Sequence, residues 1–277
     1  NDNLQGSIYI GRGSILGNPY PITPEADRAT VIEQYHRYLE HEIKQQNPLV
    51  MYALRQLKED DRLACYCSPQ ACHGDSIDIL WQQYIKPELE RGPLRSLSYA
   101  GIGARKTPED TLSYMAKLAG RFDQLGYTLR SGGALGADSA FESGALSKEV
   151  YLPWPGYNDN TSQFDCVNSM ALRLAEQLHP AWASLSQGVQ KLMARNCYQI
   201  LGEDLKTPVD FVVCWTPDGA ETAEARSSKT GGTGLAIELA DIFGIPVFNL
   251  KNKDAVARLA DYVKSNPSYD NGRSMCQ

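Results

Sequence analysis

The sequence lacks the features of membrane, secreted and repetitive proteins. No apolar run in its 277 residues approaches the roughly 20 residues that span a bilayer, and the polar N-terminus carries no basic and apolar leader. There is no internal repeat and no low-complexity tract. The seven cysteines are an odd number without the spacing of a small disulfide-bonded domain, which favours a reducing compartment. We therefore expect a cytoplasmic protein without a membrane partner.

An excess of basic residues is also lacking, because 27 Lys and Arg stand against 33 Asp and Glu and give a net charge of −6. This balance argues against a large non-specific nucleic-acid surface, so nucleic acid is not expected as a partner. The length allows two domains, each with its own core. The pair Gly92-Pro93 ends a predicted amphipathic helix over 76–90, which places the domains at 1–92 and 96–277.

The segment Lys229-Thr-Gly-Gly-Thr-Gly-Leu-Ala-Ile-Glu238 predicts a phosphate-binding turn at the start of a helix. It follows a strand-like run over 209–215, and an apolar helical pattern lies beyond it. Glycines let the backbone approach a ligand, and the free N–H groups and the dipole of a helix N-terminus favour an anion. A tight turn without a ligand explains the segment equally well when it is taken alone.

Two further glycine-rich turns favour a ligand. Tyr99-Ala-Gly-Ile-Gly-Ala-Arg105 and Thr128-Leu-Arg-Ser-Gly-Gly-Ala-Leu-Gly-Ala-Asp138 each combine a short strand, a turn and the approach to a helix. Such units build a parallel sheet whose turns converge at the carboxyl ends of neighbouring strands. We therefore predict a Rossmann-like α/β fold with flanking helices, preceded by a smaller α/β domain. All three turns are expected to meet in one crevice and to bind an anion through bare main-chain amides.

An insert separates the second turn from the third. It starts as a strand and becomes an aromatic loop, in which Trp154 either stacks on a base or anchors the loop on the sheet. Helices are predicted near 162–178 and 184–202. The second of them carries Arg195 and Asn196, which suit contacts with a phosphate or a base edge.

The smaller domain contains two concentrated motifs. The first, Ile8-Tyr-Ile-Gly-Arg-Gly-Ser-Ile-Leu-Gly-Asn-Pro-Tyr20, predicts a strand followed by a turn. The second, Leu63-Ala-Cys-Tyr-Cys-Ser-Pro-Gln-Ala-Cys-His-Gly-Asp75, predicts a short strand, a turn and a helix. Together they supply polar and metal-ligating side chains: Arg12, Asn18, Cys65, Cys67, Cys72, His73 and Asp75.

Three interpretations of this second motif stay open. The thiols of Cys65, Cys67 and Cys72 with the imidazole of His73 suit zinc, although their spacing differs from the paired CxxC of common zinc sites. The thiols could instead be packed or line a pocket. A small polar ligand held by arginine, asparagine, histidine and aspartate side chains is the third interpretation. No cofactor is expected to be required, and no metal ligand is assigned.

From about residue 98 to 250 the chain resembles the SLOG superfamily of Rossmann-like nucleotide-binding domains. Relatives in that superfamily include LOG phosphoribohydrolases, the DNA-processing protein DprA and sensor domains of prokaryotic defence systems. The resemblance is carried by Gly101-Ile-Gly103, Ser131-Gly-Gly133, Gly136-Ala-Asp138 and Gly231-Gly-Thr-Gly234 with Glu238. Phage and bacterial proteins share the patterns GIGxR, LRSGGAxGAD, LPWPG and TGGTGxAI. Residues 7–90 resemble a further small domain marked by GRGSxLGNP and CxCxPxxCHGD.

This resemblance implies a homo-oligomer (a dimer or higher) that captures a nucleotide or a molecule derived from NAD or ADP-ribose. Capture would serve to sense the signal or, in a phage-encoded protein in the host cytoplasm, to sequester it against host defence. A LOG-like N-glycoside or phosphoribosyl hydrolase is the alternative. LOG enzymes have PGGxGTxxE at the third turn, whereas this chain has Thr230 and Leu235 in place of that Pro and Thr, so binding is favoured. DprA-like binding of single-stranded DNA is a third alternative that the acidic charge disfavours.

These arguments define the predicted sites. The predicted ligand-binding residues are Gly101, Gly103, Arg105, Ser131, Gly132, Gly133, Asp138, Trp154, Arg195, Asn196, Gly231, Gly232, Thr233 and Gly234. If the protein is a hydrolase, the acid/base residue is expected among Glu238, Asp138 and Glu142.

Overall fold

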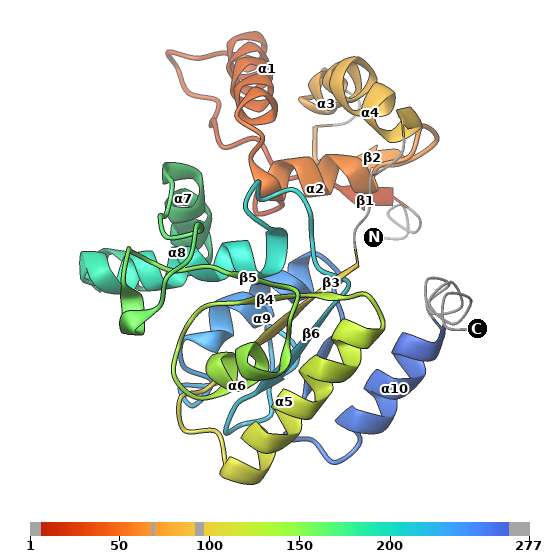
Figure 1. Cartoon of the computed structure of the whole chain (residues 1–277). Helices are drawn as coiled ribbons and strands as arrows, with labels where there is room; N and C mark the ends of the chain where they lie inside the picture. Colours follow the sequence, from red (N-terminus) through yellow and green to blue (C-terminus); the bar gives the residue numbers. More distant parts are fainter. Residues whose placement is uncertain (1–6, 68–69, 92–96, 266–277) are drawn as a thin grey trace. The chain divides into compact units, whose positions relative to one another are not determined.

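The chain forms two compact units, Asn1–Leu94 (unit 1) and Arg95–Gln277 (unit 2). The computed structural model describes residues 7–67, 70–91 and 97–265 (Figure 1). The predicted domain boundary falls on 92–96, which lie outside the described residues. Both units combine helices with parallel strands, which confirms the predicted α/β class.

Unit 1 is built around two short parallel strands. Its elements in chain order are β1 (Ser7–Tyr9), α1 (Arg28–Lys44), α2 (Pro48–Gln56), β2 (Arg62–Ala64), α3 (Gly74–Leu80), the π-helical turn η1 (Trp81–Ile85) and α4 (Lys86–Arg91). Parallel strands require a long crossover, which α1 and α2 supply. The helix predicted over 76–90 is present as the continuous run from α3 through η1 to α4.

Local sequence signals start the helices of unit 1. The Asp27 side chain accepts a hydrogen bond of 2.8 Å from the Thr30 amide and caps α1. Asn47 caps α2 in the same way, and Pro48 stands at the first turn, where its missing N–H costs nothing. The helices bury one apolar cluster against the strands, with Tyr35, Leu39, Leu54, Ile77 and Leu80 at its centre.

Unit 2 is a five-stranded parallel sheet with helices on both faces. Its elements in chain order are β3 (Ser98–Gly103), α5 (Glu109–Gln124), β4 (Thr128–Ser131), α6 (Ala137–Gly144), β5 (Lys148–Val150), the short 3₁₀ turn η2 (Tyr157–Asp159), α7 (Ser169–Leu178), the 3₁₀ turn η3 (Trp182–Ser184), α8 (Gln187–Leu201), β6 (Phe211–Trp215), α9 (Thr233–Ile242), β7 (Val247–Asn249) and α10 (Ala255–Ser265). The strand order is β5-β4-β3-β6-β7. The chain therefore leaves β3 in one direction to β4 and later returns to its other side with β6, as in doubly wound folds.

The core of unit 2 lies on both faces of this sheet. On one face, α5, α6 and α10 pack against aromatic side chains of the strands, among them Tyr99 and Phe211, whose rings stack with centroids 5.6 Å apart. Helices α8 and α9 contact each other and the sheet from the other side (Figure 1). Because both faces are covered, β6 is an unbroken run of buried apolar residues, FVVCW.

One predicted helix begins later than expected. The helix expected near 162–178 begins only at Ser169, because residues before it are extended and Phe164 bridges to Tyr151 at the end of β5. Asn168 sets the new start, since its side chain accepts a hydrogen bond of 2.8 Å from the Ala171 amide. The helix expected near 184–202 is confirmed as α8, which Ser186 caps.

Candidate functional site

The main cavity of unit 2 lies where the strand order reverses, at the carboxyl ends of β3 and β6. Its volume is about 430 Å³, within the range of small-molecule sites. Open α/β sheets bind ligands at this switch point, because the connections leave in opposite directions and open a crevice between them. The lining residues are Ile102, Gly103, Ala104, Arg105, Lys106, Ala134, Asp138, Tyr157, Leu192, Met193, Arg195, Asn196, Gln199, Pro217, Lys229, Thr230, Gly231, Gly232, Thr233 and Ala236.

The third glycine-rich turn forms one wall of this cavity and leads directly into α9. Thr230, Gly231 and Gly232 line it, followed by Thr233, the first residue of the helix. Gly232 stands at the N-cap position, and no side chain caps the helix. The Gly234 amide donates a hydrogen bond of 3.0 Å to the Gly231 carbonyl, and the remaining first N–H groups of α9 together with the helix dipole favour an anion.

The charge at the cavity is positive although the protein is acidic. Four basic side chains and one carboxylate line it, the basic ones being Arg105, Lys106, Arg195 and Lys229. Arg105, Lys106 and Lys229 are exposed, whereas Arg195 is buried. The exposed basic side chains attract a negatively charged ligand to the rim, and Arg195 provides one desolvated guanidinium deeper in the cavity.

Arg195 is the buried cation of the site. Only 5% of its surface is exposed, and its Nη1 lies 3.4 Å from Oδ2 of Asp138. None of the described residues accepts a hydrogen bond from its Nε. A buried donor without an acceptor is costly, so a ligand acceptor that reached this nitrogen would be stabilised. Its neighbour on α8, Asn196, donates a hydrogen bond of 2.9 Å to the Gly232 carbonyl and so holds the third turn.

Asp138 is the one carboxylate at the cavity. It is buried and accepts hydrogen bonds from the Gly132 amide at 3.1 Å and from Gln199 at 3.5 Å. Burial raises its pKa to about 6, although the Arg195 charge acts in the opposite direction. A carboxyl group with a raised pKa in a cavity is a candidate for proton transfer.

The second glycine-rich turn contributes less to the cavity than predicted. The Gly132 amide is bound to Asp138, and the Gly133 amide donates a hydrogen bond of 2.9 Å to Glu142. The Ser131 hydroxyl also donates to Glu142. A side chain at Gly132 would occupy the place of the Arg195 guanidinium, which lies directly over this turn. The amides of this turn are therefore occupied by the protein's own carboxylates, and the turn positions Arg195 and Asp138 instead.

Among the other predicted ligand-binding residues, the structure brings some to the cavity and leaves others apart. Gly103, Arg105, Arg195, Asn196, Gly231, Gly232 and Thr233 line it with Asp138, whereas Gly101, Ser131, Gly132, Gly133, Trp154 and Gly234 do not. Gly101 lies within β3, where a side chain would collide with Phe141 and Leu129. Trp154 packs edge-on against Tyr157, with ring centroids 5.1 Å apart, and anchors the loop.

Glu238, the first candidate acid/base residue, lies away from the cavity. It forms an ion pair of 2.7 Å with Arg226, which also donates a hydrogen bond to the Gly234 carbonyl. The pair braces the first turns of α9 from the side. Asp138 is thus the only one of the predicted acid/base residues that lines the cavity.

Asp218 is a residue of the site that sequence reasoning missed. Its carboxylate accepts hydrogen bonds from the amide and hydroxyl groups of Ser227 and from the hydroxyl groups of Thr230 and Thr216. Burial alone would raise its pKa, but these hydrogen bonds outweigh burial and hold the pKa well below its usual range. The ionised carboxylate therefore ties the end of β6 to the third turn. Its position in an Asp-Gly pair directly after a buried strand was the available signal.

Unit 1 has a cavity of its own, with a volume of about 350 Å³. Arg12 and Arg28 line it, as do Asn18 and His73. Asn18 has a structural role, because its side-chain oxygen accepts a hydrogen bond of 2.8 Å from the Tyr20 amide. Asp75 is exposed in the first turn of α3 and does not line this cavity.

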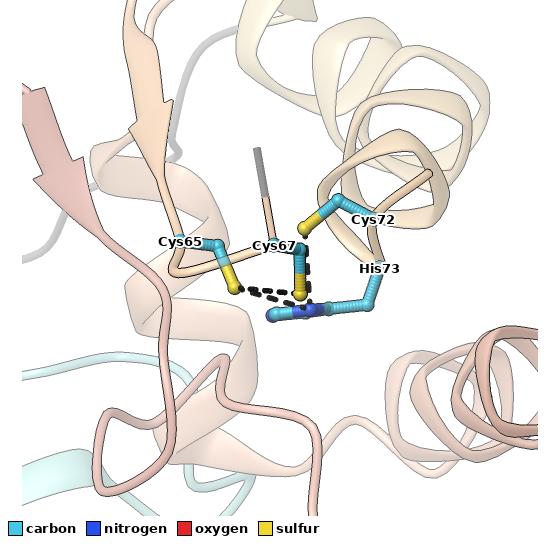
Figure 2. A group of neighbouring side chains, drawn as sticks. All are labelled: Cys65, Cys67, Cys72 and His73. Carbon is cyan, nitrogen blue, oxygen red and sulfur yellow. Dashed lines mark hydrogen bonds between the residues drawn. The ribbon is translucent and has the colours of Figure 1, made fainter. Parts of the chain in front are cut away.

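Three cysteines and a histidine of unit 1 converge beside this second cavity (Figure 2). The sulfur atoms of Cys65, Cys67 and Cys72 and a nitrogen of His73 all lie within 4.8 Å of one another. Cys65 and Cys67 point the same way, as expected, although β2 ends before them at Ala64. All three cysteines are free thiols, and the group is within the distance that coordination of one metal ion requires.

Comparison with known proteins gives one family match and one distant structural likeness. Residues 1–83, most of unit 1 and less than a third of the chain, match the model of a family described as a domain of unknown function, DUF4326. A solved structure of DNA processing protein A from Helicobacter pylori, described for its single-stranded DNA binding mode, is 17% identical. That match covers 65% of this chain and 80% of that chain, with a TM-score of 0.36. No curated protein sequence matches significantly.

The described helices give no sign of a membrane-spanning segment. None of them combines the length and the apolar composition that crossing a bilayer requires.

Proposed function

We propose that unit 2 binds a phosphorylated small molecule of the nucleotide class in the cavity at the ends of β3 and β6. One observation carries the proposal: the first turn of α9, which no side chain caps, lines the same cavity as Arg195, whose buried Nε has no acceptor among the described residues. Each of the two groups favours an acceptor, and a phosphate supplies several acceptor oxygens on one centre.

The rest of the cavity supports a ligand larger than inorganic phosphate. Its apolar lining includes Leu192 and Met193 of α8, Pro217 after β6 and the ring of Tyr157. Flat apolar and aromatic surfaces suit a base or a nicotinamide, while the exposed cations at the rim suit a second phosphate. The Rossmann strand order and the position of the glycine turns support a SLOG-type domain at 96–277, and within this class we favour a ligand derived from NAD or ADP-ribose.

We infer capture, for sensing or sequestration, rather than turnover. Glu238, the carboxylate that the hydrolase hypothesis needs at the third turn, is occupied by Arg226 outside the cavity. The second candidate function, hydrolysis of an N-glycosidic bond, rests on Asp138, which lines the cavity with a raised pKa. That carboxylate is engaged with Gly132, Arg195 and Gln199, an arrangement that suits a positioning role at least as well.

Isothermal titration of the full chain with ADP-ribose, NAD and AMP tests the proposal. Arg105→Gln and Lys229→Gln remove exposed charges without disturbing the core, and each should weaken binding by about 1 kcal/mol, or roughly fivefold. The matched control is Lys117→Gln, which removes an exposed charge from α5 outside the cavity. Equal affinities for all three variants and the unmodified chain would contradict the proposal, as would the absence of binding by every one of the ligands.

Chromatography of the ligand after long incubation separates capture from hydrolysis. Capture predicts that the ligand is recovered unchanged from the denatured protein. Accumulation of free base beyond one equivalent, abolished by Asp138→Asn with affinity retained, would establish the hydrolase alternative instead.

A further inference from the structure

We propose that unit 1 binds one Zn²⁺ ion through the sulfur atoms of Cys65, Cys67 and Cys72 and through Nδ1 of His73, as a closed structural site. This proposal is independent of ligand binding in unit 2. It concerns the Cys/His cluster alone, whose members come from the end of β2, the loop after it and the residue before α3.

The cluster has the dimensions of a tetrahedral zinc site. Zinc bonds of about 2.3 Å to sulfur and about 2.0 Å to nitrogen place two sulfur ligands about 3.8 Å apart and a sulfur about 3.5 Å from the nitrogen. The Sγ atoms of Cys65 and Cys67 are 3.4 Å apart. Nδ1 of His73 lies 3.8 Å from Sγ of Cys65 and 3.5 Å from Sγ of Cys72. The three sulfur atoms and the histidine nitrogen already surround a space of the size that a zinc ion requires (Figure 2).

The protonation of His73 is set by its other ring nitrogen. Nε2 lies 2.8 Å from the carbonyl oxygen of Ile10, which can only accept a hydrogen bond, so Nε2 carries the proton. The lone pair of Nδ1 therefore points at the three sulfur atoms. Tyr35 packs edge-on against the buried imidazole, with ring centroids 4.9 Å apart, and fixes its orientation. A backbone carbonyl that orients a ligating histidine is the usual second contact of protein zinc sites.

A metal at the centre of the cluster would complete the contacts of its sulfur atoms. The Gly74 amide donates to Sγ of Cys72 at 3.5 Å, a contact that stabilises a charged sulfur. Apart from the Gly74 amide and the Arg28 side chain, the polar contacts of the three thiols are with each other and with an imidazole lone pair. Such contacts contribute little, because a thiol is a weak donor and a weak acceptor. One divalent cation at their centre satisfies all four groups. Zinc is the metal for which three cysteines and one histidine in tetrahedral geometry are typical.

Zinc would crosslink segments of unit 1 that are distant in the sequence. The described parts of the two strands are three residues long each, and the Ile10 carbonyl, directly after β1, lies 2.8 Å from Nε2 of His73, directly before α3. Binding all four ligands joins the end of β2, the start of α3 and, through His73, the end of β1. With four protein ligands no position is left open for a substrate, so the site is structural.

The experiment begins with the metal content of the full chain purified under reducing conditions without chelator. The unmodified protein and Cys166→Ser, a matched control at an exposed cysteine of unit 2, should each contain one equivalent of zinc. The double variant Cys65→Ser, Cys67→Ser should contain less than a tenth of an equivalent. Equal zinc content in all three proteins, or less than a tenth of an equivalent in the unmodified chain after growth with added zinc, would overturn the proposal.

A second measurement stands even if the double variant fails to fold. The unmodified chain loaded with Co²⁺ should show the intense visible bands of a tetrahedral ion and sulfur-to-cobalt charge-transfer bands, both abolished by added Zn²⁺. Weak octahedral bands, or a disulfide between two of these cysteines in the reduced preparation, would sink the idea. Amide hydrogen exchange completes the test. Adding a chelator should speed the exchange of amides in β2 and α3 and leave exchange in the sheet of unit 2 unchanged. Unchanged exchange in unit 1 would refute the structural role of the metal.

Discussion

The buried carboxyl group of Asp138 makes the stability of unit 2 depend on pH in a defined direction. Its pKa is about 6 in the folded chain and 3.8 in the absence of the fold, because burial penalises the charged form. The folded state therefore holds the proton more tightly than the unfolded state. The contribution of this group is most favourable below about pH 4 and is lost as the pH rises through 6.

The size of the effect follows from the two pKa values. Raising the pKa of Asp138 from 3.8 to about 6 corresponds to about 3 kcal/mol in total, of which about 1 kcal/mol is lost between about pH 5 and pH 8. Asp138→Asn removes the titration. The free energy of unfolding of this variant, minus that of the unmodified chain, should therefore increase by about 1 kcal/mol over the same interval. The lost contact with Arg195 adds only a constant to this difference.

Urea unfolding followed by tryptophan fluorescence measures this difference, since three of the four tryptophans lie in unit 2. Asp261→Asn is the matched control, because it removes one exposed aspartate of α10 that does not line the cavity. A pH-dependent difference no larger for Asp138→Asn than for this control would refute the argument that burial governs the Asp138 carboxyl group.

Three further predictions test the framework of the site. Gly103→Ala should lower the free energy of unfolding by roughly 1–3 kcal/mol, because its Cβ would lie 2.8 Å from the Trp215 carbonyl oxygen. The control Gly188→Ala, at an open position of α8, should not lower it. Equal denaturation midpoints for the two variants would contradict this prediction. Asp218→Ala should weaken ADP-ribose binding roughly tenfold in calorimetry, because it removes the hydrogen bonds that hold the third turn. An unchanged affinity would show that these hydrogen bonds to Asp218 are not needed for binding. The affinity for ADP-ribose should fall from about pH 5 to pH 8, because Asp138 gains a negative charge over this interval while the phosphates of the ligand do not titrate near neutrality. An affinity that rises with pH would place the phosphates away from Asp138.

The part of the cavity lining that the sequence indicates depends on contacts close in sequence. The third turn and the start of α9 follow from one run of glycines ahead of an apolar helical pattern, and the structure has both. Arg105 and Arg195 were selected by residue type, and both line the cavity. Lys229 lies directly before the third turn, so its place at the rim could have been predicted as well.

The part that could not be predicted depends on contacts between distant segments. The amides of Gly132 and Gly133 look as bare in sequence as those of the third turn, yet they are occupied by carboxylates from α6. Arg195, which covers Gly132, is 57 residues from its partner Asp138. Glu238 occupies a position that the resemblance associates with catalysis, and only the fold brings Arg226 against it.

The sequence by itself determined the class of each unit, because strand length, apolar periodicity and glycine turns are local properties that already require parallel α/β units. Tertiary structure alone decided which donors the chain itself occupies: residues of all three glycine turns line the cavity, but the amides of Gly132 and Gly133 in the second turn are bound by carboxylates of α6. It also decided that His73 presents Nδ1 to three sulfur atoms, since the carbonyl oxygen that binds its Nε2 lies 63 residues away. Hydrogen bonds of this kind depend on spatial neighbours, which no local pattern specifies.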